Sequence, residues 1–217
     1  MLAAKVFAAG ITHLTDARYF AAWDVDYLAF PLGEDLPDAI GWEQFNVLRE
    51  WVEGPAIVAE LGVRTEVAPW AETLLAAGVN IALLPATAPA AAPQLLHAAG
   101  MKVFLHLPVA GYESADDVRE NLRQHPTAAS VILDFEAGGI TWQDLAAGHP
   151  FGLPELRELL AQRPCYLQID LGGEDPKTIV RDFAPAGLAV RGSSEEKVGY
   201  KSFDDLDGLF EGLEIFE

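Results

Sequence analysis

The chain has 217 residues, of which 51% are apolar and 22% are charged; this predicts a folded protein with a substantial core and excludes a disordered chain. Its 14 Lys and Arg residues against 33 Asp and Glu residues give a net charge of −19, which argues against binding to duplex nucleic acid or to an anionic membrane. The single cysteine, Cys165, excludes an internal disulfide and a cysteine-based zinc site.

Short apolar segments of strand length recur along the chain. They are apolar on both faces, which is typical of a parallel sheet covered by helices. In chain order, the predicted strands are Lys5–Ala9, Asp26–Phe30, Ala56–Leu61, Asn80–Leu84, Lys102–Leu107, Ser130–Phe135, Cys165–Asp170 and Gly187–Arg191.

Segments of helical length lie between and after these strands. Ser114, followed by two aspartates, is a typical helix start, and Gly100 is a typical helix end. The predicted helices are Thr15–Trp23, Trp42–Val52, Val67–Ala77, Ala90–Ala99, Ser114–Gln124, Pro154–Gln162, Pro176–Phe183 and Phe203–Leu213.

Eight strands and eight helices in strict alternation, at about 27 residues per unit, predict an α/β protein with one (β/α)8 TIM-barrel domain over residues 1–217 and eight parallel strands. A doubly wound open sheet is the competing architecture. The absence of a break or linker along the alternating units favours the closed barrel.

In such a barrel the active site lies at the carboxyl ends of the strands. That rule selects polar residues that end a predicted strand or follow one. They are Thr12, His13, Asp16, Glu60, Arg64, His106, Asp134, Glu136, Asp170, Arg191, Ser193, Ser194 and Glu195.

Asp134 stands out because it closes the apolar segment Val131-Ile-Leu-Asp134. A carboxyl group at the rim of an apolar barrel is partly desolvated, which suits it to general acid–base chemistry. Two structural roles compete with this interpretation: Asp134 caps the following helix, or it pairs with Arg191. His13 and His106 lie at the same end of the barrel and are candidates for the same chemistry, although each also fits a purely structural role.

Two glycine-containing loops follow the last two predicted strands, and we interpret them as a phosphate site. Gly172 and Gly173 precede a helix, and Gly192 precedes Ser193 and Ser194. Glycine lets backbone N–H groups close on an anion, and a helix N-terminus adds partial positive charge. The neighbouring carboxylates, Glu174 and Asp175 among them, count against a phosphate dianion, and a tight turn is the alternative interpretation.

Several segments together resemble phosphoribosylanthranilate isomerases, in the order in which that family carries them. The first runs from Lys5-Val-Phe-Ala-Ala-Gly10-Ile-Thr12 to Asp16-Ala, and the second is Asp26–Phe30. The others are Val131–Asp134 with Gly138-Gly139 and Trp142, Gly172-Gly173 with Pro176, and Ala189–Ser194 followed by Gly199–Ser202. The resemblance implies a (β/α)8 barrel that isomerises a phosphoribosyl-amine by an Amadori rearrangement in tryptophan biosynthesis.

The resemblance also implies roles for single residues. Asp134 keeps the position of the family's general acid, whereas Ala9 occupies the position of its general base, a cysteine. The segment Pro31–Pro37 lacks the arginine that the family places after its second strand. A methyl group cannot remove a proton, so the base is either a substitute such as His13 or His106, or absent.

These observations leave two functions open. One is an aldose–ketose isomerase of a phosphoribosyl-amine or related sugar phosphate, which would be an intramolecular oxidoreductase. The other is a catalytically impaired relative that binds a ligand or another protein. On either interpretation we expect a small phosphorylated ligand, no cofactor, no metal, no nucleic acid and no membrane. The lack of a membrane span or signal-peptide pattern leads us to expect a soluble, cytoplasmic protein.

Overall fold

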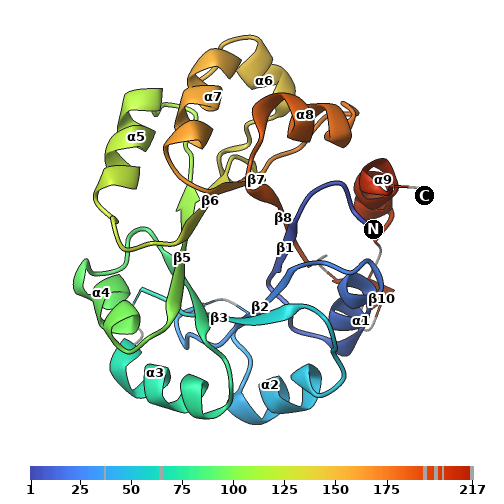
Figure 1. The fold of residues 1–217 in the computed structure, drawn as a ribbon. Helices are drawn as coiled ribbons and strands as arrows, with labels where there is room; N and C mark the ends of the chain where they lie inside the picture. The colour runs from blue at the N-terminus through green and yellow to red at the C-terminus, as the bar shows by residue number, and fades with distance from the viewer. Residues whose placement is uncertain (37, 64–65, 193–194, 198–199, 202, 216–217) are drawn as a thin grey trace.

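A computed structural model describes residues 1–36, 38–63, 66–192, 195–197, 200–201 and 203–215. Its eight barrel strands close into a ring in which each strand pairs in parallel with its chain neighbours, and β1 pairs with β8 (Figure 1). The strands are β1 (Val6–Ala9), β2 (Tyr27–Pro31), β3 (Ala56–Glu60), β4 (Ile81–Pro85), β5 (Lys102–Pro108), β6 (Ser130–Asp134), β7 (Cys165–Gln168) and β8 (Gly187–Arg191).

The helices form an outer layer around this ring (Figure 1). They are α1 (Leu14–Ala22), α2 (Trp42–Arg49), α3 (Val67–Ala76), α4 (Ala91–Ala98), α5 (Ala115–Arg123), α6 (Trp142–Ala146), α7 (Leu153–Gln162), α8 (Pro176–Phe183) and α9 (Asp204–Leu213). The predicted closed barrel is therefore confirmed, and the competing open sheet is wrong.

Four elements were not predicted. A short 3-10 helix, η1 (Glu136–Gly138), and the five-residue helix α6 lie between β6 and α7. Two short strands, β9 (Glu195–Lys197) and β10 (Tyr200–Lys201), form an antiparallel pair after β8. The alternation is thus interrupted after β6 and after β8, both at the end of the barrel where the candidate residues lie.

Successive residues of each strand face alternately into the barrel and out toward the helices. The apolar side chains therefore form two clusters, one inside the barrel and one outside it. The larger one packs the outer face of the strands against the helices. The smaller one fills the inside of the barrel, where four aromatic rings from β1, β2, β5 and β7 have centroids 5.3 to 6.0 Å apart. We call this set, Phe7, Tyr27, Phe104 and Tyr166, the aromatic floor.

The residue two positions after each floor residue points to the same side of its strand and lies closer to the carboxyl end of the barrel. In β1 and β2 these positions hold Ala9 and Ala29, and in β5 and β7 they hold His106 and Gln168. The floor therefore closes the barrel below, and small or polar side chains surround the space above it. We call that carboxyl end the mouth.

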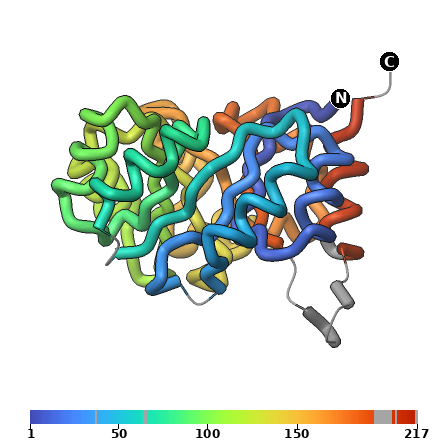
Figure 2. Tube along the Cα trace, turned by 90° about the horizontal axis from the view of Figure 1, so that it is seen from below, coloured from blue at the N-terminus to red at the C-terminus, as the bar shows by residue number. Residues whose placement is uncertain are grey.

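Both chain ends lie at the opposite end of the barrel. Leu2 forms an antiparallel bridge with Glu214, and the Ala3 N–H donates to the Leu213 carbonyl at 2.8 Å. Figure 2 shows the N-terminus beside the red end of α9 at one face of the molecule. The first and last segments thus hold each other beside the start of β1.

Candidate functional site

The mouth gathers polar side chains from strands far apart in the sequence. The strand register places these residues on the inward face, two positions beyond members of the inner cluster. They are Glu60 on β3, His106 on β5, Asp134 on β6, Gln168 on β7 and Arg191 on β8. The predicted concentration of candidate residues at one end of the barrel follows from this register.

His106 and Asp134 form the central pair of the mouth. The His106 Nε2 lies 2.8 Å from the Asp134 Oδ2, and the side chains are 21% and 5% exposed. At this distance the two groups share a proton, donated either by the imidazole N–H or by a protonated carboxyl group. The pair can therefore hold and deliver one proton at the edge of the barrel interior.

The second oxygen of Asp134 has a structural role. Its Oδ1 accepts the Ala137 N–H at 2.9 Å and so fixes the first turn of η1. Asp134 therefore binds the backbone of the turn after β6 rather than capping the predicted helix, since Phe135 is the residue that precedes η1. This bond coexists with the His106 contact because each uses a different oxygen. The alternative pairing of Asp134 with Arg191 is wrong: Arg191 contacts Glu60, with Nη2 3.4 Å from Oε1.

Glu136 follows Asp134 by two residues and faces the end of β7. Its Oε2 accepts a hydrogen bond from the Gln168 Nε2 at 3.2 Å. Burial raises the pKa of Glu136, and the nearby charges of Asp134 and Asp170 raise it further, while the Gln168 hydrogen bond opposes the rise. The mouth thus carries a strong negative potential on its β6–β7 side.

The predicted phosphate loops are held by internal hydrogen bonds. The Gly172 N–H donates to the Asp170 Oδ1 at 2.8 Å, and the Gly192 N–H donates to the Ala9 carbonyl at 2.9 Å. At the start of α8, the Asp175 Oδ1 accepts the Lys177 N–H at 3.1 Å. An anion at Gly172 or at the start of α8 therefore has to compete with a carboxylate of the chain itself.

Other predicted site residues belong to the loops that follow β1, β7 and β8. His13 is exposed and precedes α1, with no capping hydrogen bond from its side chain. Gly173 is exposed in the loop before α8. Ser193 and Ser194 lie outside the described residues, as does Arg64, and for Glu195 only the backbone of β9 is described.

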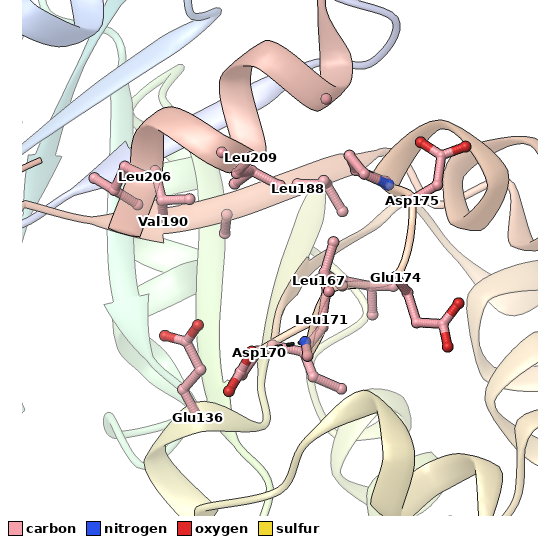
Figure 3. A pocket seen from close by; sticks show the side chains of 17 residues that line it. Glu136, Leu167, Asp170, Leu171, Glu174, Asp175, Leu188, Val190, Leu206 and Leu209 are labelled. Atoms are coloured by element: carbon pink, nitrogen blue, oxygen red, sulfur yellow. Dashed lines mark hydrogen bonds between the residues drawn. The ribbon is translucent and has the colours of Figure 1, made fainter. Parts of the chain in front are cut away.

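A cavity of about 880 Å³ lies between helix α9 and the outer face of β7 and β8 (Figure 3). Its inner part is apolar, with leucines from β7, β8 and α9 facing one another, whereas Glu136, Asp170, Glu174 and Asp175 are its acidic members (Figure 3). The cavity includes the predicted loop Gly172–Gly173, but neither His106 nor Asp134 lines it, and its polar lining is anionic.

Two parts of the mouth were missed from the sequence. Gln168 was overlooked because β7 was expected to continue to Asp170; the strand ends at Gln168, and Asp170 turns back to the Gly172 N–H. The contact between Glu60 and Arg191 joins residues 131 positions apart. Inward and outward residues alternate along a strand. Counting two positions on from the inward residues Val58 and Tyr166 therefore predicts that Glu60 and Gln168 also face inward.

Three further observations concern the single cysteine, metal ligands and membrane-spanning helices. Cys165 is buried, and burial raises its pKa to about 12, which agrees with its predicted role as a small core residue. Over the described ranges, no group of three or more His, Cys, Asp or Glu side chains is placed to hold a metal ion. None of the described helices is both long and apolar enough to span a membrane.

With this geometry established, the chain can be compared with known proteins. No protein-family model matches it, and neither does any curated protein. Solved structures do match over almost the whole chain. A phosphoribosylanthranilate isomerase from Thermus thermophilus has a TM-score of 0.68 and 22% identity, covering 96% of this chain and 98% of its own.

Two further structures extend the comparison. An N-(5'-phosphoribosyl)anthranilate isomerase from Pyrococcus furiosus has a TM-score of 0.68 and 16% identity, covering 97% of this chain and 98% of its own. A 3-hexulose-6-phosphate synthase has a TM-score of 0.61 and 16% identity, covering 97% and 100%. At these identities the likeness shows the fold: a complete barrel of the kind found in phosphoribosylanthranilate isomerases.

Proposed function

We propose that this barrel is an aldose–ketose isomerase that acts on a phosphoribosyl-amine or a related sugar phosphate. The observation that carries the proposal is the His106–Asp134 pair at the mouth of the barrel, joined at 2.8 Å, in which Asp134 is buried and His106 half-buried. The likeness to phosphoribosylanthranilate isomerases supports it. If the substrate is phosphoribosylanthranilate itself, the step belongs to tryptophan biosynthesis.

In this reaction Asp134 is the general acid. It gives the proton held by the His106–Asp134 pair to the ring oxygen of the sugar, and the ring opens to an iminium ion. The pair then regains one proton from solvent. A base then removes the proton on C2, and the molecule rearranges to the aminoketose. C2 is oxidised while C1 is reduced within one molecule, so the reaction needs no external redox cofactor.

The phosphate is proposed to bind at Gly172–Gly173 and Gly192–Ser194. Because the Gly172 N–H donates to Asp170, phosphate binding there requires that the Asp170 carboxylate release this group. Glu136 and the Gly172–Gly173 loop line the same cavity, which supports a ligand that contacts both.

The test is turnover by the purified protein of phosphoribosylanthranilate and of simple aminoaldose phosphates, followed by chromatographic separation of the aldose and ketose isomers. Asp134→Asn should lower kcat by ~10²–10⁴-fold, because the amide has no proton to give as an acid. Asp116→Asn is the matched control, since Asp116 is an exposed aspartate on α5 whose side chain is 86% exposed. Absence of turnover by the wild-type protein, together with failure to rescue a tryptophan auxotroph lacking this step, would contradict the proposal.

A second function is favoured by two observations: the methyl group of Ala9 at the position that the resemblance gives to a base, and the carboxylate on the Gly172 N–H. Both fit a barrel that binds a ligand or another protein without catalysis. Wild-type turnover that falls in Asp134→Asn would rule this function out.

A further inference from the structure

The mouth contains a second pair of polar side chains in contact, besides His106–Asp134. Glu60 ends β3 and Arg191 ends β8, and β1 and β2 lie between these strands in the ring. On β1 the register partner of Arg191 is Ala9. On β2 the register partner of Glu60 is Pro31, and the inward residue two positions before it is Ala29. Because alanine side chains are short, the long side chains of Glu60 and Arg191 meet above them, with Oε1 and Nη2 3.4 Å apart.

The pair lies at the carboxyl end of β1. Ala9 is the register partner of Arg191, and a Cβ atom added to Gly10 would lie 3.3 Å from the Arg191 Nη2. The same Nη2 atom contacts Glu60. The Arg191 Nη2 atom therefore lies near both the Glu60 carboxylate and the end of β1. Ala9, the position that the resemblance gives to the general base, is in that part of β1.

Glu60 has an oxygen that the protein leaves unused. Its side chain is 9% exposed, and its Oε2 is buried without a hydrogen-bond partner in the described structure. A buried carboxylate oxygen without a partner costs free energy, so its retention calls for a reason. A substrate that brings a proton to this oxygen supplies one.

We propose that Glu60 is the base that removes the C2 proton, in place of a group at Ala9, with Arg191 as the residue that positions it. This inference rests on the proposed isomerase function. The Oε2 atom takes the C2 proton, the electrons of the C2–H bond form a C1–C2 double bond, and the C=N electrons move to nitrogen. The resulting enaminol then loses its C2 hydroxyl proton and gains a proton at C1, so every atom and electron stays within the substrate and the proton pool.

The decisive variant is Glu60→Gln, which keeps the size of the side chain but has almost no basicity. With the aminoaldose phosphate that the wild-type protein turns over, kcat should fall by at least ~10²-fold while KM changes by no more than about 3-fold. Exchange of the C2 proton with deuterated solvent should be lost in parallel. Glu120→Gln is the matched control, because Glu120 also pairs with an arginine, Arg123, but on the exposed surface of α5.

Glu60→Asp provides a second variant that keeps the carboxylate but withdraws it by one methylene group. It should retain activity between those of the wild type and Glu60→Gln, and substrate deuterated at C2 should react more slowly than unlabelled substrate, in wild type and variant alike. A merely structural ion pair would change the melting temperature without the large loss of kcat at nearly unchanged KM.

The outcomes separate the two proposals. Wild-type turnover with unchanged kcat in Glu60→Gln or in Glu60→Asp overturns the role of Glu60 and leaves the isomerase standing. Absence of wild-type turnover overturns the isomerase and, with it, the role of Glu60. Should Glu60→Gln fail to fold, as judged by circular dichroism, the kinetics of Glu60→Asp alone decide the question.

Discussion

Asp134 and Glu136 are two residues apart, yet their environments assign them different chemistry. Asp134 is buried and has a partner on each oxygen, the His106 ring and the Ala137 N–H. Glu136 accepts from Gln168 and faces the charges of two other carboxylates. Asp134 is thus held in a fixed geometry for proton transfer. The Glu136 carboxylate is instead destabilised by the negative charges around it.

Glu136→Gln should therefore stabilise the protein, and the effect should depend on pH. A raised pKa in the folded state means that the Glu136 carboxylate costs stability above the pKa of the unfolded chain and costs nothing below it. The melting temperature of Glu136→Gln should exceed that of the wild type near pH ~7, and the difference should vanish near pH ~3.

The control for this prediction has the opposite sign. Hydrogen bonds from Ser114 lower the pKa of Asp117 in the folded state, so its carboxylate stabilises the protein at neutral pH and this stabilisation is lost as the pH falls through that lowered pKa. Asp117→Asn should accordingly lower the melting temperature at neutral pH and not in acid. Equal pH dependence of both variants would contradict the assignment.

At the scale of single elements, α5 shows how a local motif fixes a helix start. Ser114 and Asp117 form a capping box: the Ser114 Oγ accepts the Asp117 N–H at 3.3 Å, and the Asp117 Oδ2 accepts the Ser114 N–H at 2.8 Å. Thr141 and Asp144 form the same motif at the start of α6. Both motifs satisfy N–H groups that a helix leaves unpaired at its first turn.

Ser114→Ala should destabilise the protein by ~1 kcal/mol, because it removes the acceptor for the Asp117 N–H. The free energy of unfolding in urea measures this loss. Ser114→Thr keeps the hydroxyl group and should stay close to the wild type. An unchanged unfolding midpoint in Ser114→Ala would show that the cap does not contribute.

The elements that were predictable are those with a strong apolar pattern. Every barrel strand was visible as a short apolar segment, and β8 and α8 begin and end at the predicted residues. The helix α6 was missed because five residues give too little periodicity, although its Thr141–Asp144 capping pair was readable. The strands β9 and β10 were missed because each has at most three residues.

The site was predictable only in part, for a geometric reason. The rule that strand ends carry the chemistry selected both His106 and Asp134 as candidates, but it did not predict that they lie 2.8 Å apart. The rule gave no information on which residues meet across the ring. Arg191 was therefore considered as a partner of Asp134, and its contact with Glu60 was missed. That contact depends on the short side chains of Ala9 and Ala29, an effect of the closed ring rather than of any one segment.

For the molecule as a whole, the aromatic floor is the structure that divides the barrel interior from the mouth. Phe7 is fully buried and lies within 6.0 Å of three other rings, counted between centroids. Its neighbours come from β2, β5 and β7, so the side chain links strands from opposite sides of the ring. Few substitutions elsewhere would remove contacts from so many strands at once.

Phe7→Ala should cost ~3–5 kcal/mol in the free energy of unfolding, because it leaves a cavity among rigid rings that cannot collapse into it. Phe7→Leu, which fills more of the space, should cost less. Tyr112→Ala is the control, since Tyr112 is an aromatic residue that is 90% exposed and should be near neutral. A loss in Phe7→Ala no larger than in this control would show that the floor does not stabilise the barrel.

The bridge between Leu2 and Glu214 brings both ends of the polypeptide together on the side away from the mouth. A fluorophore, a tag or a surface tether attached at either end would therefore leave the entrance for small molecules open. A short peptide joining the ends would preserve the ring, and fresh ends could then be cut in an exposed loop. The barrel is thus suited to immobilised binding measurements in which the anchoring side and the ligand side do not interfere.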